Sequence, residues 1–380
     1  MRDKRRQGVC RAQFRVIPKE VVNREPEGEG TAALKLNREW DAFLERSPLG
    51  QFQQSSGWAR VKAHEGWQVH RVYADPQRPS EGGLQLLWKQ SRFGRFGYIS
   101  KGPVLPVETP AAVNAMMVTL KARAASLGLR AMILQPPDDS EISTETLIKH
   151  GFGRDPVEFV IRATAVVDVS GGRVPFMEHM GKKSRWEARQ ALKQGVTVRV
   201  GSRADLPLFF SLMLETCRRQ RTQPNPSRLE LIEALWDAFS PTVMVGFAVH
   251  AGKAVAGVLM IGHGHRMTIW KKGWNSQDSH LFANRLLNIE AFGWSCDRGY
   301  AAVDFVALDS QIAETLLSGG KLTEAQRSSR DIFHLRLGAQ PKLLPPARLL
   351  VINPALRRLH RLLGLIPAVE RGLMHRLGSI

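Results

Sequence analysis

Two side chains near the end of the sequence have the chemistry to move a proton or to stabilise a developing negative charge. His334 lies in the segment DIFHLRLGA, and a histidine can donate a hydrogen bond to an oxyanion or carry a proton near neutral pH. We expect this segment to be a strand, which would place Arg336 on the same face as His334. Asp304 ends the segment AAVDF, where its carboxylate could accept a proton or hold an amine. A histidine satisfied within the core and an ordinary strand-end carboxylate are the alternatives.

Other catalytic patterns are missing from the order of residues. No Ser-His-Asp or Cys-His arrangement can be recognised, and the remaining histidines lack metal-ligand spacing. The three cysteines, Cys10, Cys217 and Cys296, stand far apart with no Cys-x-x-Cys. We therefore expect no metal site, no disulfide framework and a reducing cytoplasm.

The charge of the chain predicts an anionic partner. The 380 residues carry a formal net charge of +19, which suits nucleic acid, an acidic membrane surface or a phosphorylated substrate. A generally basic proteome is the alternative explanation. The length predicts two or three domains. No apolar run approaches the roughly 18 residues that span a bilayer, and no apolar signal core follows the basic N-terminus.

A helix near the middle of the chain, MEHMGKKSRWEARQALKQG (177–195), has two distinct faces. Four basic residues recur at helical spacing, namely Lys182, Arg185, Arg189 and Lys193. A second stripe beside them is made of Met180 and small residues, namely Ser184, Ala188 and Ala191. The basic stripe is either a surface that faces phosphates or an ordinary solvated face.

The remaining elements repeat one order twice. We predict helices at 37–48 and 55–67, three strands, a helix at 110–127, a strand, a short helix and an extended segment ending in TAVVDV. The second half follows with helices at 205–219 and 227–239, three strands, a helix at 280–297, strand AAVDFV, a helix near 310–317 and the strand DIFHLRL. This order is typical of an acetyltransferase-like (GNAT) α+β unit, in which helices cover one mixed sheet.

The fold class is thus α+β, with two tandem acetyltransferase-like domains. We place a flexible basic tail at 1–30, the first domain at 31–165, and a linking strand and basic helix at 166–198. The second domain follows at 199–342, and a basic amphipathic tail occupies 343–380.

The loop that opens the helix at 280–297 departs from the acetyltransferase pattern. In those enzymes a Gln/Arg-x-x-Gly-x-Gly loop exposes backbone N–H groups that hold the pyrophosphate of coenzyme A. Here the loop is SQDSHLF, with no glycine after Gly273. The sequence therefore argues against the usual coenzyme A site.

Several segments together resemble the Fem family of peptidoglycan interpeptide-bridge aminoacyltransferases. The resemblance spans about 37–340 and rests on the order and spacing of its pieces. These are QSSGWARVKAHEGW, YISKGPVL, TAVVDV, KSRWEARQALKQGVTVRV, LETCRRQR, HLFANRLLNIEAFGWSCDRGYAAVDF and FHLRLGAQP.

The resemblance implies an enzyme that takes an amino acid from aminoacyl-tRNA, with no cofactor beyond that co-substrate. Its acceptor would be an amine on the stem peptide of a lipid-linked or UDP-linked peptidoglycan precursor. An amine would attack an aminoacyl ester through an oxyanion that needs a nearby cation or donor. A tRNA donor requires no pyrophosphate loop, which would explain the missing glycines.

The resemblance also assigns binding residues. It implies that Lys62 and Arg219 contact the phosphates of the acceptor, a role that Arg221 could share. An exposed helical lysine and a charge at a helix C-terminus are the alternatives. Tyrosines that family members often carry a few residues on are replaced here by PNPSRLEL, which is a departure from the family pattern on the acceptor side.

The second domain and the linking helix hold the remaining matches. His334 stands where the family carries a lysine that stabilises developing charge, with Arg336 beside it. The other residues that match or complete this site are Arg185, Arg189, Trp270, Asn284 and Asp304. His334 and Asp304 would be catalytic, and the others would bind substrate.

The C-terminal tail predicts either a membrane contact or an internal one. Leu356, Leu359, Leu363 and Ile366 share one face, and Arg357, Arg358 and Arg361 lie off it. A basic amphipathic helix of this kind can rest on anionic lipid, and packing on the second domain is equally economical. We expect a cytoplasmic protein, with the inner face of the membrane as a further possible location.

Two rival functions remain at this stage. One is a coenzyme-A-dependent N-acyltransferase acting on an envelope sugar or amine. The other is a non-catalytic scaffold that binds RNA or membrane.

Overall fold

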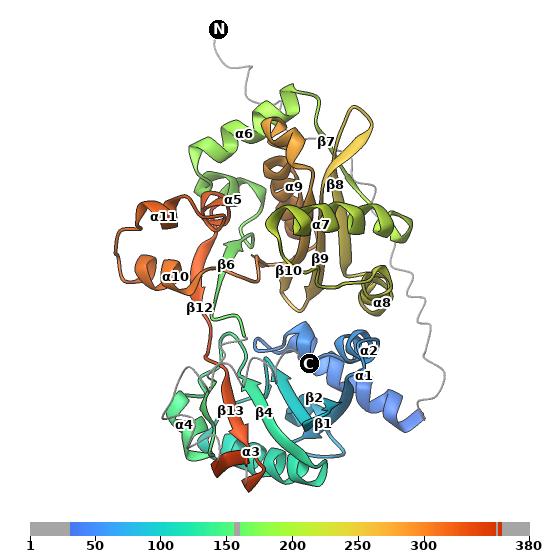
Figure 1. The fold of residues 1–380 in the computed structure, drawn as a ribbon, viewed down its shortest axis with the longest axis vertical. Helices are drawn as coiled ribbons and strands as arrows, with labels where there is room; N and C mark the ends of the chain where they lie inside the picture. The colour runs from blue at the N-terminus through green and yellow to red at the C-terminus, as the bar shows by residue number, and fades with distance from the viewer. Residues whose placement is uncertain (1–30, 156–159, 355, 359–380) are drawn as a thin grey trace.

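The computed structural model describes residues 31–155, 160–354 and 356–358. Each of its two sheets has helices packed on it, and the two sheets lie one above the other along the long axis of the molecule (Figure 1). Both halves are acetyltransferase-like, which confirms the predicted fold class. In the described part of the chain no helix is both long enough and apolar enough to cross a membrane.

The first domain is built on a six-stranded sheet with the order β1-β2-β3-β4-β13-β5. Strands β1 to β3 form an antiparallel meander, and β3 pairs with β4 in parallel. Its elements are α1 (Thr31–Arg46), α2 (Ser56–Ala63), β1 (Gln68–Tyr73), β2 (Gly83–Ser91), β3 (Gly94–Ser100), α3 (Pro110–Ser126), β4 (Leu129–Gln135), α4 (Thr144–Lys149) and β5 (Gly153–Arg154). Leucines and methionines of β2, α3 and β4 fill its core.

The second domain has a seven-stranded sheet with the order β12-β6-β11-β10-β9-β8-β7. Helix α9 packs against this sheet, and most of its residues are buried. The elements in chain order are β6 (Ala163–Asp168), α5 (Arg173–His179), α6 (Lys182–Lys193), β7 (Thr197–Val200), α7 (Leu206–Gln220), α8 (Leu229–Phe239), β8 (Val243–His250), β9 (Lys253–His263), β10 (Arg266–Trp274), α9 (Ala283–Asp297), β11 (Ala302–Asp304), α10 (Ser310–Leu317), α11 (Glu324–Arg327), α12 (Ile332–Arg336) and β12 (Gln340–Leu343).

Two strands show that the domain boundaries predicted from the sequence are wrong. Strand β6 pairs with β11 and β12, so the second sheet already begins within the span that was assigned to the first domain and the linker. The chain then returns, and β13 (Arg348–Val351) inserts between β4 and β5 of the first sheet. The predicted tail at 343–380 therefore contains an interior strand. Its Leu350 is buried in the main core of the first domain, and its Leu349 is buried on the other face of the sheet, against Ala131 and Ile133 of β4.

The segment 331–337 is a helix and not the predicted strand. The five residues of α12 are followed by a turn at Gly338, and β12 begins only at Gln340. Side chains two positions apart on a helix point in different directions. His334 and Arg336 consequently do not share a face, which corrects the sequence-based expectation.

The sheet of the second domain opens next to α9. Strand β11 pairs in parallel with the first residues of β10 and ends at Asp304, whereas β10 continues to Trp274. Strand β10 also carries a β-bulge between Ile269 and Lys271, which bends a strand and re-aims its side chains. Beyond Thr268, β10 therefore stays paired with β9, while the edge that β11 no longer covers borders a cavity.

Candidate active site

A cavity of about 710 Å³ lies where β10 extends beyond the end of β11. Its walls come from the second half of β10, the start of α9, the end of α7, the segment after β11, and α12. Gly273 allows one of these walls to close, because a Cβ there would lie 2.4 Å from the backbone nitrogen of Met213 on α7. The cavity combines aromatic rings with cationic and amide side chains, as ligand pockets do.

Lys272 and His334 form the central pair of the cavity. Their Nζ and Nε2 atoms lie 2.8 Å apart. The imidazole stacks on Phe305 at 4.1 Å between ring centroids, and the Lys272 amine lies 4.9 Å from the Phe305 centroid and 5.4 Å from that of Phe333. Sequence patterns could not predict this pairing, because 62 positions separate its two members.

The lysine of this pair is the group that titrates near neutral pH. Burial, helped by Arg330 and Arg285 and opposed by Asp331, lowers the pKa of Lys272 to about 7. Burial, with Lys272 as the next cause, lowers the pKa of His334 to about 2. The imidazole is therefore neutral at physiological pH, so the expectation that it carries protons by its own titration is wrong.

The neutral imidazole has one free polar atom in the described structure. Nδ1 of His334 is buried and has no hydrogen-bond partner there. When Lys272 is protonated it donates to Nε2, which leaves the imidazole proton on Nδ1 as an unused donor. A pair of this kind can accept a proton at one end and offer a hydrogen bond at the other.

The first turn of α9 forms an amide-lined wall. Asn284 and Asn288 both line the cavity, and Asn288 Nδ2 donates to the carbonyl oxygen of Asn284 at 2.7 Å. Asn288 is 1% exposed, and its Oδ1 has no partner in the described structure. The first residues of α9 line the cavity and no side chain caps the helix start, so its positive end lies at the cavity wall. This wall offers an acceptor for an ammonium group beside a favourable position for negative charge.

Arginine and tryptophan residues surround the opposite wall. The Arg219 guanidinium lies 4.5 Å from the Trp274 ring centroid and donates to the Trp274 carbonyl oxygen at 3.2 Å. Trp270 meets Trp58 of the first domain edge to face, 6.4 Å between centroids. Arg219, Trp270, Asn284 and His334 are thus the predicted residues that the structure brings together in one cavity.

The glycine-free loop forms a short 3-10 turn, η4 (Ser276–Leu281). Part of its polar backbone is used internally, since Gln277 N–H donates to Asn275 Oδ1 and Phe282 N–H donates to the Ser279 carbonyl. Phe282 takes a left-handed conformation at the end of the turn and lines the cavity. A phenylalanine thus fills a position next to α9 where a glycine loop would leave backbone exposed.

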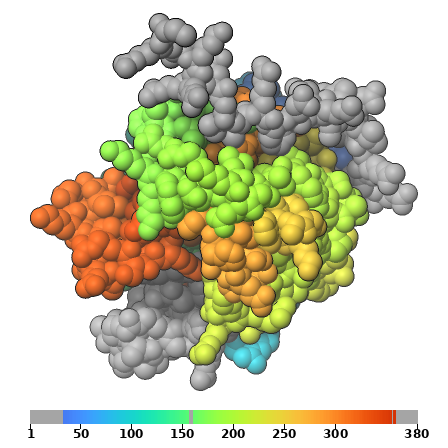
Figure 2. Space-filling view, turned by 90° about the horizontal axis from the view of Figure 1, so that it is seen from above, coloured from blue at the N-terminus to red at the C-terminus, as the bar shows by residue number. Residues whose placement is uncertain are grey.

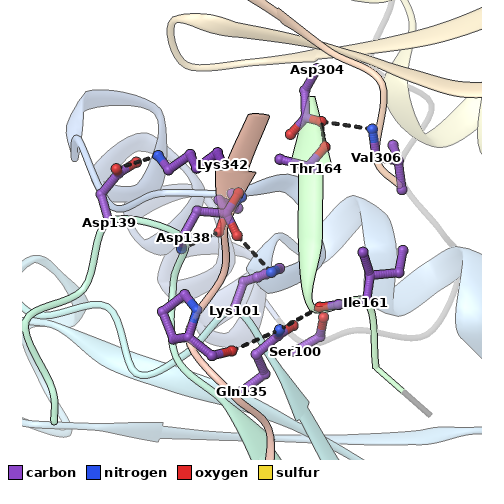
Figure 3. A network of polar contacts seen from close by, with 12 residues as sticks. Ser100, Lys101, Gln135, Asp138, Asp139, Ile161, Thr164, Asp304, Val306 and Lys342 are labelled. Carbon is purple, nitrogen blue, oxygen red and sulfur yellow. Dashed lines mark hydrogen bonds and ion pairs between the residues drawn. The ribbon is translucent and has the colours of Figure 1, made fainter. Parts of the chain in front are cut away.

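Asp304 does not face this cavity and belongs to a buried polar network between the domains (Figure 3). It accepts hydrogen bonds from Thr164 Oγ1 and from Val306 N–H, and lies 3.3 Å from Arg266. Arg266 also pairs with Asp138 of the first domain. Burial raises the pKa of Asp304. The predicted catalytic role of Asp304 is therefore replaced by a structural one.

The other side of this network ties the first domain to the second. Asp138 lies 2.6 Å from Lys101, and Lys342 of β12 pairs with Asp139. Burial alone would raise the pKa of Asp138, but Lys101 and Arg266 outweigh it and lower that pKa. Apolar residues join the domains as well, because Phe52 packs edge to face on Phe239 of α8.

The remaining predicted binding residues lie outside the cavity. Lys62 pairs with Glu65 and lies over the rings of Trp58 and Trp67, at 5.6 and 5.8 Å. Arg221 is exposed in a left-handed turn at the end of α7. The last three lie on the surface formed by α6 and α12, namely Arg185, Arg189 and Arg336.

The sequence analysis did not identify a buried ion pair in the cavity wall. Glu187 of α6 and Arg285 of α9 form a buried pair, with Oε2 and Nε 2.8 Å apart. The signal for Lys272 was present but weak, since TIWKKGW puts two lysines into an otherwise apolar strand. In the described residues no cluster of three His, Cys, Asp or Glu side chains could hold a metal ion.

Comparison with known proteins assigns a family model to each half of the chain. Residues 36–146 match the FemAB family, and residues 180–311 match the acetyltransferase (GNAT) domain. The lipid II:glycine glycyltransferase of Staphylococcus aureus (strain MRSA252) is 27% identical over 197 residues, which is 48% of this chain and 46% of that protein. The chain thus spans about half the length of the curated relatives it matches.

Solved structures confirm the fold. The crystal structure of FemX superposes with a TM-score of 0.72 at 17% identity, covering 87% of this chain and 98% of the other. A conserved protein of unknown function from Bacteroides thetaiotaomicron gives a TM-score of 0.53 at 14% identity, covering 83% and 96%. Both likenesses extend over the two domains together.

Proposed function

This chain belongs to the Fem-type family of tandem acetyltransferase-like proteins, and from that premise we propose that it is an aminoacyltransferase of cell-wall synthesis. It takes an amino acid from aminoacyl-tRNA and transfers it to an amine on the stem peptide of a peptidoglycan precursor. The relatives named lipid II:glycine glycyltransferase support a lipid-linked acceptor. An acceptor of that kind brings the protein to the cytoplasmic face of the membrane.

The observation that carries this proposal is the buried amine of Lys272, whose pKa is about 7, in a cavity that the glycine-free loop also lines. Aminolysis of an ester needs a base, because the attacking amine must lose a proton as the new bond forms. A base whose pKa lies near the working pH is the most effective. The loop, for its part, does not offer the glycine backbone with which acetyltransferases hold coenzyme A.

The reaction is a single exchange at the ester carbon. The nitrogen of the acceptor amine forms a bond to the carbonyl carbon, and the bond from that carbon to the ribose oxygen breaks. Lys272 takes the proton that the amine loses and returns it to the departing ribose oxygen. While Lys272 is protonated it donates to Nε2 of His334, so Nδ1–H of His334 stabilises the oxyanion.

The surrounding residues hold the two substrates. The unpartnered Oδ1 of Asn288 accepts a hydrogen bond from the ammonium group of the transferred amino acid. Arg219, which lies over the Trp274 ring, and Lys62, which lies over the Trp58 ring, bind the acceptor's phosphates. Trp270 and Trp274 offer aromatic faces to the donor's terminal nucleotide.

Transfer from a charged tRNA pool tests the proposal. Purified protein is incubated with tRNA carrying labelled amino acids and with lipid-linked or UDP-linked precursor, and the precursor is analysed by mass spectrometry. We expect a mass gain of one or more aminoacyl residues that requires charged tRNA. Transfer from acyl-coenzyme A, with none from charged tRNA, would overturn the donor assignment.

A further inference from the structure

The outer face of α6 is a row of cations beside an exposed tryptophan. Lys182, Lys183, Arg189 and Lys193 are exposed along the helix, and none of them has an acidic partner among the described residues. Trp186 lies among them with 47% of its surface exposed. Tryptophan is highly buried on average, whereas this one lies about half exposed within a row of cations and beside Phe282, as a ring that stacks on a ligand would.

The opposite face of α6 is buried against the rest of the protein. Met180, Ser184, Ala188 and Ala191 are buried, and α6 packs on α9 through this side. The small-residue stripe seen in the sequence is thus the inner face, and the cations are on the outer one. The helix is rigidly held, so its outer face is a fixed surface and not a loose linker.

This surface is continuous with the cavity. The Trp186 ring lies 5.7 Å from that of Phe282, and Phe282 lines the cavity. Glu187, the next residue of α6, lines it too. At the other end, the carbonyl oxygen of Arg336 accepts hydrogen bonds from Ser184 Oγ and Gly181 N–H. The exposed Arg336 therefore extends the basic surface toward α12, and Figure 2 views this end of the molecule.

We propose that the outer face of α6 is the docking surface for the acceptor stem of the donor tRNA, with Trp186 stacking on an unpaired base near its 3′ end. This inference rests on the proposed function, because only an RNA donor must be brought to this cavity. Lysines and an arginine spaced along one helix suit the phosphates of an RNA stem. Single-stranded bases stack on aromatic rings with little sequence preference, and Phe282 continues that path into the cavity.

Binding of uncharged tRNA, measured by fluorescence anisotropy between 50 and 200 mM salt, tests the surface apart from catalysis. A triple variant, called the rail variant, removes three cations of the outer face of α6 and carries Lys182→Gln, Arg189→Gln and Lys193→Gln. The slope of log K against log salt is negative, and each lost phosphate contact makes it shallower by roughly 0.7 to 0.9. We therefore expect the slope to become less negative by about 2 to 3. Trp186→Ala should weaken binding by roughly 5- to 100-fold and leave the slope unchanged.

A matched control removes the same charge from the first domain. Arg92→Gln, Arg123→Gln and Lys149→Gln alter three exposed residues, in the β2–β3 turn, α3 and α4. Figure 1 shows the first domain at the opposite end of the molecule from α6, so this variant should bind tRNA nearly as the unaltered protein does. In transfer assays the rail variant should raise KM for charged tRNA and keep kcat. Circular dichroism checks that every variant folds.

The outcomes separate this inference from the proposed function. If the unaltered protein neither binds tRNA nor uses it as donor, the proposed function fails. If it does both, but the rail and control variants behave alike, only the docking surface is wrong. If the rail variant no longer binds anionic phosphatidylglycerol vesicles but still binds RNA, this face is a membrane contact. That result would also overturn the inference.

Discussion

Among single residues, Lys272 bears the largest part of the proposed chemistry. With a pKa of about 7 its amine is half neutral at neutral pH. Because the neutral amine is the active form of a base, kcat/KM should rise with pH through this pKa and then level off. The groups that face Lys272 are His334, Arg330, Asp331 and Arg285. The pH profile of the transfer reaction measures this rise.

Substituting Lys272 separates a base from a fixed positive charge. Lys272→Arg keeps the cation but stays protonated at every usable pH, so we expect kcat to fall by roughly 10²-fold or more. Lys272→Met should lose at least as much, whereas the exposed Lys253→Met serves as the control. An arginine variant with nearly full activity would show that Lys272 acts only through its charge.

His334 should matter through its hydrogen bonds and not through its own titration. His334→Ala removes the acceptor that Lys272 contacts at 2.8 Å and the Nδ1 donor, so turnover should drop by roughly 10²-fold. His334→Gln restores an acceptor and should be the milder change. Steady-state kinetics across pH would check that the rise near pH 7 survives in the glutamine variant. Its disappearance there would assign the titration to the imidazole.

At the scale of elements, the loop η4 decides which donor the second domain can hold. Its turn is closed by its own hydrogen bonds and by Phe282, without a glycine. We therefore expect isothermal titration calorimetry to detect no saturable binding of coenzyme A at physiological concentrations. Tight binding of acetyl-coenzyme A would instead mean that the open start of α9 is enough to hold its pyrophosphate.

Most helices and strands could be predicted from the sequence, because helix starts and apolar runs are marked by a few neighbouring residues. Pro110 marks the start of α3, and the apolar run VMVGFAVH, followed by the tight turn AGK, indicates β8. The segment around His334 misled us because FHLRL alternates like a strand, yet five residues are too few to separate a strand from one helical turn. The contact between Lys272 and His334 depends on long-range packing, which no short pattern contains.

At the scale of the whole molecule, the chain crosses twice between the domains. Strand β6 enters the second sheet early, and β13 returns to the first. Sequence order alone suggested two consecutive units, because nothing local tells a strand which sheet it will join. The ion network around Asp138 and Arg266 lies between the two sheets. This network helps to fix the position of one domain on the other.

This crossing changes what removal of the C-terminus should do. The predicted membrane contact of the tail involves Leu359, Arg361, Leu363 and Ile366, which lie outside the described residues. Leu356, the first leucine of that face, packs against β13 and β4 residues of the first domain. Removal of residues 359–380 should therefore leave the fold intact, and any loss of sedimentation with anionic liposomes would report a membrane contact.

Removal of residues 343–380 is the harsher truncation. It deletes β13, leaving β4 and β5 without the strand between them. Leu349, Leu350 and Val351 are buried there, and each such side chain contributes roughly 1.5–3 kcal/mol when fully buried. The free energy of unfolding should therefore fall by several kcal/mol, and thermal unfolding followed by circular dichroism should show a much lower Tm than that of the 359–380 truncation. Equal Tm values for the two truncations would mean that β13 adds little to the first domain.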